Sequence, residues 1–168
     1  ERIKRRLLAP FPFPETFHGC VPHRSAKSNA EVHRQNSCLV RLDLADYYPH
    51  VTCQMVYNAW SHALSFGPPI ASLLTRLTTV RGHLPQGAIT SGYIGNLVLL
   101  SVSHRIESVS KSLGCKVTFY DDDITFSGVS ARRMIQPTIE MVRSAGLSAR
   151  HRKTRSMSSR EAQVTTGY

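Results

Sequence analysis

Three aspartates in the sequence have the chemistry and the placement of ligands for a metal ion. Asp43 lies near the end of residues 38–44, an apolar segment that predicts a largely buried strand. Asp122 and Asp123 lie far along the chain, between two short apolar segments that predict the strands of a hairpin. Carboxylates at strand ends lose hydration and repel one another unless a cation compensates them. Hard oxygen ligands suit Mg²⁺, so the sequence predicts a magnesium site at these residues.

The acidic run Asp121–Asp123 also has a simpler interpretation. Asp is common in turns, so the run taken alone favours a solvated turn without a metal. That interpretation does not account for the apolar segments on both sides of the run, or for Asp43 at the end of another strand. Two magnesium ions held close together would activate a 3′-hydroxyl group and stabilise a leaving pyrophosphate, which is the chemistry of nucleotidyl transfer.

The charge balance indicates a polyanionic partner. The 168 residues include 21 Lys and Arg against 11 Asp and Glu, which gives a formal net charge of +10. An ordinary solvated basic surface is the alternative. However, basic residues crowd towards both ends of the chain, whereas the acidic residues gather elsewhere, notably at residues 121–123. A basic rim around a small acidic centre is what a metal-dependent enzyme acting on nucleic acid needs.

The four cysteines indicate a reducing compartment. They form no closely spaced pairs, so we expect free thiols and a cytoplasmic protein. His18, Cys20 and His23, with His33 beyond them, are an alternative set of zinc ligands, but structural zinc sites usually rest on tight cysteine pairs. No apolar run reaches the roughly 20 residues that a membrane-spanning helix needs, so we expect no membrane partner.

The patterning predicts one α+β domain. We expect a helix that Pro49 opens and a later helix whose start Pro137 delays or kinks. Helices and strands mix without the strict alternation of an α/β protein. The expected helices are residues 1–9, 25–34, 49–66, 70–78, 90–112 and 131–145, and the expected strands are 38–44, 116–120, 124–127 and 163–166.

Several motifs occur in order along almost the whole chain, and together they resemble those of bacterial reverse transcriptases of the retron and group II intron type. Residues 42–49 (LDLADYYP) resemble motif A, and residues 18–33 resemble the block that precedes it in retron enzymes. Residues 84–91 (LPQGAITS) with 96–97 (NL) resemble motif B, and residues 119–128 (FYDDDITFSG) resemble motif C. Residues 153–155 and 164–167 resemble motif D and the block after it. The sequence departs from the pattern at Ile89 and Gly92, where retron enzymes usually have prolines, and at Asp121, the variable residue of motif C.

The resemblance implies roles in catalysis. Asp43, Asp122 and Asp123 become catalytic ligands of two Mg²⁺ ions, with Mn²⁺ as an alternative ion. Lys153 would reach the triphosphate and donate a proton to the leaving pyrophosphate. For a lysine in a basic tail, a solvated charge is the simpler interpretation.

The resemblance also implies roles in binding. Tyr48 would lie under the sugar of the incoming nucleotide, where its ring would clash with a 2′-hydroxyl group, and core packing is its simpler role. Gln86 and Gly87 would lie along the template–nucleotide pair, where glycine permits close approach of the backbone, and an ordinary loop is their simpler interpretation. Arg24 would contact a nucleic-acid phosphate.

The implied fold is the palm of a right-hand polymerase, a small antiparallel sheet backed by helices, with part of the fingers. We expect residues 1–36 and 51–82 to belong to the fingers, and residues 37–50 (motif A) and 83–168 (motifs B, C and D) to belong to the palm. The first finger strands and the thumb are expected to be absent. Residue 1 is Glu rather than Met, which predicts a chain that is cut from a longer one or processed.

The implied function is RNA-directed DNA polymerisation. The expected partners are an RNA template, a DNA or RNA primer and deoxynucleoside triphosphates, and the expected parent is a retron-type or antiviral-defence enzyme. Three alternatives stay open: a non-catalytic nucleic-acid-binding palm remnant, an untemplated polymerase and an RNA-dependent RNA polymerase. Enzymes of the last class usually space their motif A aspartates further apart than Asp43 and Asp46, and they lack the Leu-Pro-Gln-Gly loop.

Overall fold

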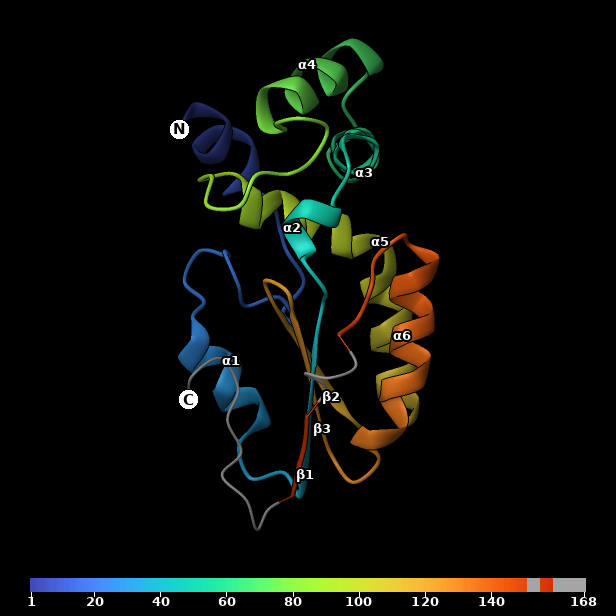
Figure 1. The fold of residues 1–168 in the computed structure, drawn as a ribbon. Coiled ribbons are helices and arrows are strands. Elements are labelled where there is room, and N and C mark those ends of the chain that lie inside the picture. The colour runs from blue at the N-terminus through green and yellow to red at the C-terminus, as the bar shows by residue number, and fades with distance from the viewer. Residues whose placement is uncertain (151–154, 159–168) are drawn as a thin grey trace. The chain divides into compact units, whose positions relative to one another are not determined.

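The computed structural model describes residues 1–150 and 155–158, and the chain divides into two compact units (Figure 1). One unit holds Glu1–Pro12 and Asp46–Ser101, and the other holds Phe13–Ala45 and the chain from Val102 onwards. The boundary falls inside helix α5 (Ser91–Ser112), which therefore gives its first half to one unit and its second half to the other.

The first unit is helical. Its elements are a π-helical segment (Lys4–Leu8), α2 (Tyr47–His50), α3 (Cys53–Asn58), a second π-helical segment (Ala59–Ala63), α4 (Pro68–Thr78) and the first half of α5. The Trp60 side chain is fully buried and anchors the core, together with Val56, Leu84 and Ile94. Pro68 lies in the first turn of α4, where its missing N–H leaves no helical bond unmade, so this helix begins earlier than predicted.

The prediction of one helix over residues 49–66 is wrong at its start. Pro49 lies inside the short α2, and the chain returns to an extended backbone at Val51 and Thr52 before α3 begins. Thr52 is the N-cap of α3, and its hydroxyl accepts a hydrogen bond from the first turn of that helix. The Leu84 N–H donates to the Val51 carbonyl, at 2.9 Å. A tertiary contact and a cap therefore interrupt the helix that Pro49 was expected to open.

The second unit is built on a four-stranded antiparallel sheet in the order β2-β3-β1-β4. The strands are β1 (Cys38–Asp43), β2 (Lys116–Tyr120), β3 (Asp123–Ser127) and β4 (Arg155–Ser158). β1 is an interior strand, which is why its apolar residues are almost fully buried. We did not predict β4, because its sequence has no apolar alternation and its strand character comes from pairing with β1. The predicted strand at residues 163–166 lies outside the described residues.

Helices cover both faces of this sheet. In Figure 1, α1 (Ala26–His33) lies on one side of the strands, and α6 (Ile135–Ser144) and the second half of α5 lie on the other. Pro137 lies in the first turn of α6, after a 3₁₀ segment (Ala131–Met134), so the predicted delay of this helix is confirmed. None of the helices in the described part of the chain has both the length and the apolar character for crossing a membrane.

A buried histidine joins α1 to the sheet. His33 is 2% exposed, and its Nδ1 and Nε2 atoms each lie 2.7 Å from a hydroxyl oxygen, that of Ser127 and that of Thr118 respectively. Burial, with smaller contributions from His18 and Lys116, lowers the pKa of His33 to about 4. The imidazole is therefore neutral in the folded chain at neutral pH, and its two ring nitrogens link α1 to β3 and β2 through hydrogen bonds.

This histidine should make the stability of the chain fall in mild acid. In the unfolded chain the pKa of His33 returns towards 6.5, so proton uptake favours unfolding as the pH falls from about 6.5 to about 4. The contribution lost is about 3 kcal/mol. The free energy of unfolding, measured with urea at pH 7 and at pH 4, should fall more between these two pH values in the wild type than in His33→Gln. The exposed His62 supplies the control: His62→Gln should follow the wild type, and equal pH dependence of His33→Gln would contradict the role of His33.

Candidate metal centre

The β2–β3 hairpin turn places two of the aspartates. Tyr120 pairs with Asp123, so Asp121 and Asp122 form a two-residue turn. Asp121 has a φ of 51°, in the left-handed region that two-residue hairpin turns require and that Asp tolerates. Gly19 packs against this turn, and a Cβ atom on Gly19 would lie 2.5 Å from the Asp121 backbone nitrogen. A side chain at position 19 would therefore displace the turn.

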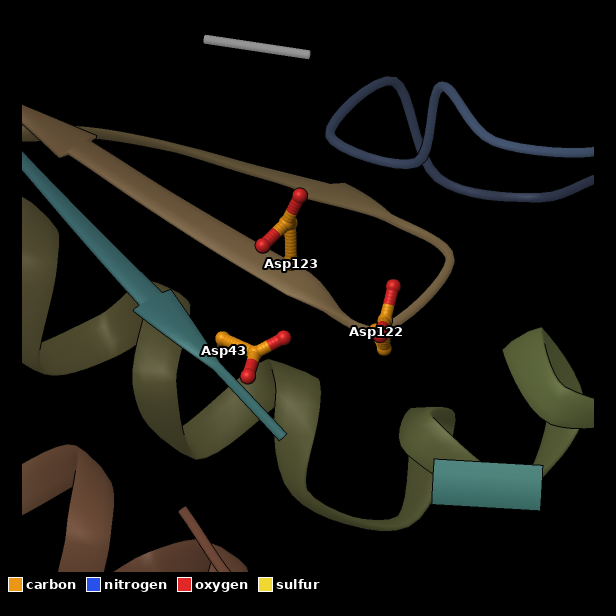
Figure 2. A group of neighbouring side chains, drawn as sticks. All are labelled: Asp43, Asp122 and Asp123. Atoms are coloured by element: carbon orange, nitrogen blue, oxygen red, sulfur yellow. The ribbon is translucent and has the colours of Figure 1, made fainter. Parts of the chain in front are cut away.

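β1 brings the third aspartate to the same place. Asp43 is the last residue of β1 and lies directly opposite Asp123 in the register. The Leu44 N–H donates to the Asp122 carbonyl at 2.8 Å, which joins the end of β1 to the turn. Figure 2 shows the three carboxylates grouped where β1 ends beside the hairpin. One oxygen from each of Asp43, Asp122 and Asp123 lies within 4.8 Å of the others.

Two of the three carboxylates are buried, the third is half-buried, and their negative charges repel one another. Asp43 is 5% exposed and Asp123 is 7% exposed. Like charges directly opposite on neighbouring strands destabilise a sheet. Burial raises the pKa of Asp123 above its ordinary value, the neighbouring carboxylates add to the increase, and Arg41 opposes it. A cation that binds here would relieve this repulsion.

Two arginines already neutralise part of the negative charge of the carboxylates. Arg41 forms a bidentate ion pair with Asp123, with its Nε and a terminal nitrogen each 2.8 Å from a carboxylate oxygen. Arg41 lies two residues before Asp43 on β1, so strand alternation puts both side chains on the same face. Arg150 lies further off: its Nε is 3.7 Å from Asp43 Oδ1, while its N–H donates to the Asp43 carbonyl at 2.8 Å. Neither arginine was predicted from the sequence, although strand alternation indicates Arg41.

The donor set fits a hard divalent cation. Three carboxylates provide oxygen ligands of the kind that Mg²⁺ and Mn²⁺ bind. In residues 1–150 and 155–158, no other group of three or more His, Cys, Asp or Glu side chains comes close enough to share an ion. The alternative zinc set is not assembled there. His18 Nδ1 lies 2.9 Å from the Ser28 hydroxyl, and both nitrogens of His33 contact hydroxyl groups in the sheet.

Asp121 lies beside the centre without joining it. The metal cluster does not include this residue. Burial raises the pKa of the Asp121 carboxyl, a hydrogen bond from Cys20 opposes the shift, and the charge of Asp122 adds to it. Asp121 therefore contributes the conformation of the turn, and its side chain contacts Cys20.

The other predicted site residues fall in different places. The Arg24 guanidinium lies in the same unit as the carboxylates and donates to the carbonyls of Pro14, Phe17 (2.6 Å) and Phe13 (3.3 Å). It therefore has a structural role, and its predicted phosphate contact stays a prediction. Tyr48, Gln86 and Gly87 belong to the first unit. Lys153 lies outside the described residues.

Comparison with known proteins identifies the family. The family model described as reverse transcriptase (RNA-dependent DNA polymerase) matches residues 2–166. The chain therefore belongs to the reverse transcriptase family.

Its relatives include reverse transcriptases of retrons. The retron Mx65 reverse transcriptase of Myxococcus xanthus is 32% identical over 190 residues, a match that covers 98% of this chain and 44% of the relative. The retron Ec86 reverse transcriptase of Escherichia coli is 30% identical over 152 residues, with 89% of this chain and 47% of the relative covered. The chain thus spans less than half the length of either relative.

A solved structure supports the architecture. The apo telomerase of Candida tropicalis, truncated from its C-terminal domain, matches with a TM-score of 0.57 at 9% sequence identity, over 76% of this chain and 31% of that chain. At this identity the match shows the fold alone. The predicted α+β class and polymerase palm are confirmed.

Removing one carboxylate should separate metal binding from folding. Asp43→Asn removes one member of the like-charged pair, so its metal-free melting temperature should equal or exceed that of the wild type. Mn²⁺ at ten times its dissociation constant should stabilise the wild type by about 1.4 kcal/mol and leave Asp43→Asn unchanged. Thermal unfolding during a Mn²⁺ titration measures both effects. Asp46→Asn alters an exposed motif A carboxylate outside the cluster and is the matched control. A full Mn²⁺ shift in Asp43→Asn would refute the site.

Proposed function

We propose that this chain carries the catalytic centre of an RNA-directed DNA polymerase of the retron type, with Asp43, Asp122 and Asp123 as ligands of two Mg²⁺ ions or of Mn²⁺. One observation carries the proposal: in a member of the reverse transcriptase family, carboxylates from two distant segments meet within 4.8 Å. The retron relatives support the choice of substrate class. The proposed partners are an RNA template, a DNA or RNA primer and deoxynucleoside triphosphates.

The carboxylates have a defined role in this chemistry. Bound divalent ions would activate the primer 3′-hydroxyl and stabilise the charge that develops on the leaving pyrophosphate. The chain itself fixes the ligands on a sheet and a tight turn, so little reorganisation is needed when ions and substrate bind. Arg41 holds Asp123 in one orientation through its bidentate pair. We assign the proton donor for pyrophosphate to Lys153.

The nucleotide-binding roles rest on features of the first unit. The Tyr47 hydroxyl donates to the Gly95 carbonyl at 2.7 Å, and the Tyr48 ring packs beside the Tyr47 ring, with centroids 5.6 Å apart. The Tyr48 ring is thus supported by a fixed neighbour, as a steric filter against a 2′-hydroxyl group requires. Gly87 has a φ of 83°, and its backbone conformation excludes most side chains. We propose that this loop, with Gln86, follows the template–nucleotide pair.

Nucleic-acid binding should draw on the positive charge of the chain. A net charge of +10 favours a polyanion through counterion release. We propose that residues 1–36 and 51–82 act as part of the fingers, and that residues 37–50 and 83–168 act as the palm. Arg24 remains a proposed phosphate contact. Retron-type parentage also makes a role in antiviral defence part of this proposal.

Primer extension tests the catalytic proposal directly. A labelled DNA primer on an RNA template should be extended with deoxynucleotides in the presence of Mg²⁺. The double variant Asp122→Asn/Asp123→Asn should lose at least about a thousandfold in rate, because the metal ligands are removed. Asp46→Asn is the matched control. Extension that persists in the double variant would refute the assigned centre, and extension without a template would indicate an untemplated polymerase. Mn²⁺ binding without any extension would indicate a palm remnant.

Sugar selection tests the proposed role of Tyr48. Replacing the ring in Tyr48→Ala should remove the clash with a 2′-hydroxyl group. The ratio of ribonucleotide to deoxynucleotide incorporation should rise by at least about tenfold, as steric filters of this size allow. Single-nucleotide extension with each nucleotide measures the ratio. Tyr57→Ala, which removes another half-buried ring of the same unit, should leave the ratio unchanged. An unchanged ratio in Tyr48→Ala would assign that residue to packing.

A further inference from the structure

Arg41 contacts both oxygens of one of the three carboxylates. Its Nε donates to Asp123 Oδ1, and a terminal nitrogen pairs with Asp123 Oδ2, each at 2.8 Å. The Asp123 side chain is only 9% exposed, so Arg41 rather than water surrounds these oxygens. Two parallel contacts of this kind fix the plane of a carboxylate as well as its position. Asp123 is therefore held in one orientation before any cation binds.

The Arg41 guanidinium also lies where a chelated cation would lie. A cation that is bound by both oxygens of a carboxylate sits between them, on the side away from the carbon chain. Arg41 approaches Asp123 from that same side, because each of its two nitrogens meets a different oxygen. Each carboxylate oxygen has two lone pairs, and Arg41 uses one on each. Asp123 can therefore offer a cation one oxygen, whereas chelation through both oxygens requires Arg41 to leave.

The fold opposes the departure of Arg41. Its backbone lies on the interior strand β1, where it pairs with Thr125 on β3 and with Arg155 on β4. Its side chain is 35% exposed and has a path to solvent, but leaving would strand a buried carboxylate without its partner. Breaking a buried ion pair in this way is strongly destabilising. Arg41 therefore stays on Asp123 unless a ligand compensates for its loss.

Divalent ions differ in how they use a carboxylate. Ca²⁺ often takes both oxygens of one carboxylate, within a flexible shell of roughly six to eight ligands. Mg²⁺ demands octahedral geometry, keeps several waters and relies on one or two carboxylates, and Mn²⁺ suits the same oxygen ligands. The centre offers one oxygen from each of Asp43, Asp122 and Asp123 within 4.8 Å of the others. That arrangement suits an ion that takes oxygens singly while Arg41 remains in place.

We propose that Arg41 is a specificity-determining residue of the metal centre, which favours Mg²⁺ and Mn²⁺ over Ca²⁺ by holding both oxygens of Asp123. The inference rests on the proposed function, because the three aspartates must hold the ions. Arg41 acts through Asp123 and is thus a positioning residue. Its positive charge also weakens the binding of every cation. The geometric effect is therefore contained in the ratio of the Ca²⁺ and Mn²⁺ affinities and not in either affinity alone.

Competition between Mn²⁺ and Ca²⁺ provides the test. The electron paramagnetic resonance signal of free Mn²⁺ gives the Mn²⁺ affinity of the chain, and displacement by Ca²⁺ gives the Ca²⁺ affinity. Binding that Asp43→Asn abolishes belongs to the centre. Arg41→Lys keeps the charge but loses the planar fork, and Arg41→Gln loses both. In both variants the Ca²⁺ affinity should rise about tenfold relative to the Mn²⁺ affinity, an effect of the size that partners of metal ligands commonly have.

The matched controls are Arg34→Lys and Arg34→Gln, because Arg34 is an exposed arginine of the same unit. Both should keep the wild-type ratio of affinities. A ratio that changes in Arg41→Gln but not in Arg41→Lys would assign the effect to charge and overturn the proposal. A wild-type ratio in both Arg41 variants would overturn it as well, while the Mn²⁺ site itself would stand.

The wild type provides a measurement that does not depend on the folding of the Arg41 variants. If it binds Ca²⁺ as tightly as Mn²⁺, Arg41 does not exclude Ca²⁺ and the proposal is overturned. If it binds no Mn²⁺ that Asp43→Asn abolishes, the proposed function fails first, and the role of Arg41 fails with it. The two failures are therefore distinguishable in one set of titrations.

Discussion

The metal centre depends on one constraint, that two like-charged carboxylates are held opposite each other on neighbouring strands. Asp43 and Asp123 pair across β1 and β3 while both are almost fully buried. Such a pair destabilises a sheet unless cations neutralise it. The bidentate ion pair of Arg41 neutralises part of this negative charge, and the Arg150 Nε lies 3.7 Å from Asp43 Oδ1. The remaining negative charge at this end of β1 and β3 favours the binding of a cation.

The rest of the second unit holds this unfavourable arrangement in place. β1 is paired on both sides, and Asp43 itself is held by its pairing with Asp123 on β3 and by the Arg150 N–H, which donates to the Asp43 carbonyl. The hairpin turn is tied to the end of β1 through Leu44 and is packed against Gly19. His33 fixes α1 to both strands of the hairpin through Ser127 and Thr118. These contacts hold the carboxylates close together, although their mutual repulsion would otherwise separate them.

The outer edge of β2 is covered unevenly. Thr16 and His18 cover β2 at Phe119, which lies near the turn, whereas a cavity opens at Val117. The segment that leads to Gly19 therefore serves two purposes, because it supports the hairpin turn and borders the cavity.

The sequence by itself determined the elements and site residues that local patterns encode. Apolar runs predicted β1, β2 and β3, periodicity predicted α5, and the motifs predicted the palm and singled out the three aspartates, which the structure brings together. The tertiary structure decided whatever depends on partners distant in sequence. These features are the break before Thr52, the strand β4, the Arg41 and Arg150 contacts, and the cavity at Val117. Contacts between residues far apart in the sequence create these features. A local sequence pattern does not contain them, because the contacting residues come together only when the chain folds.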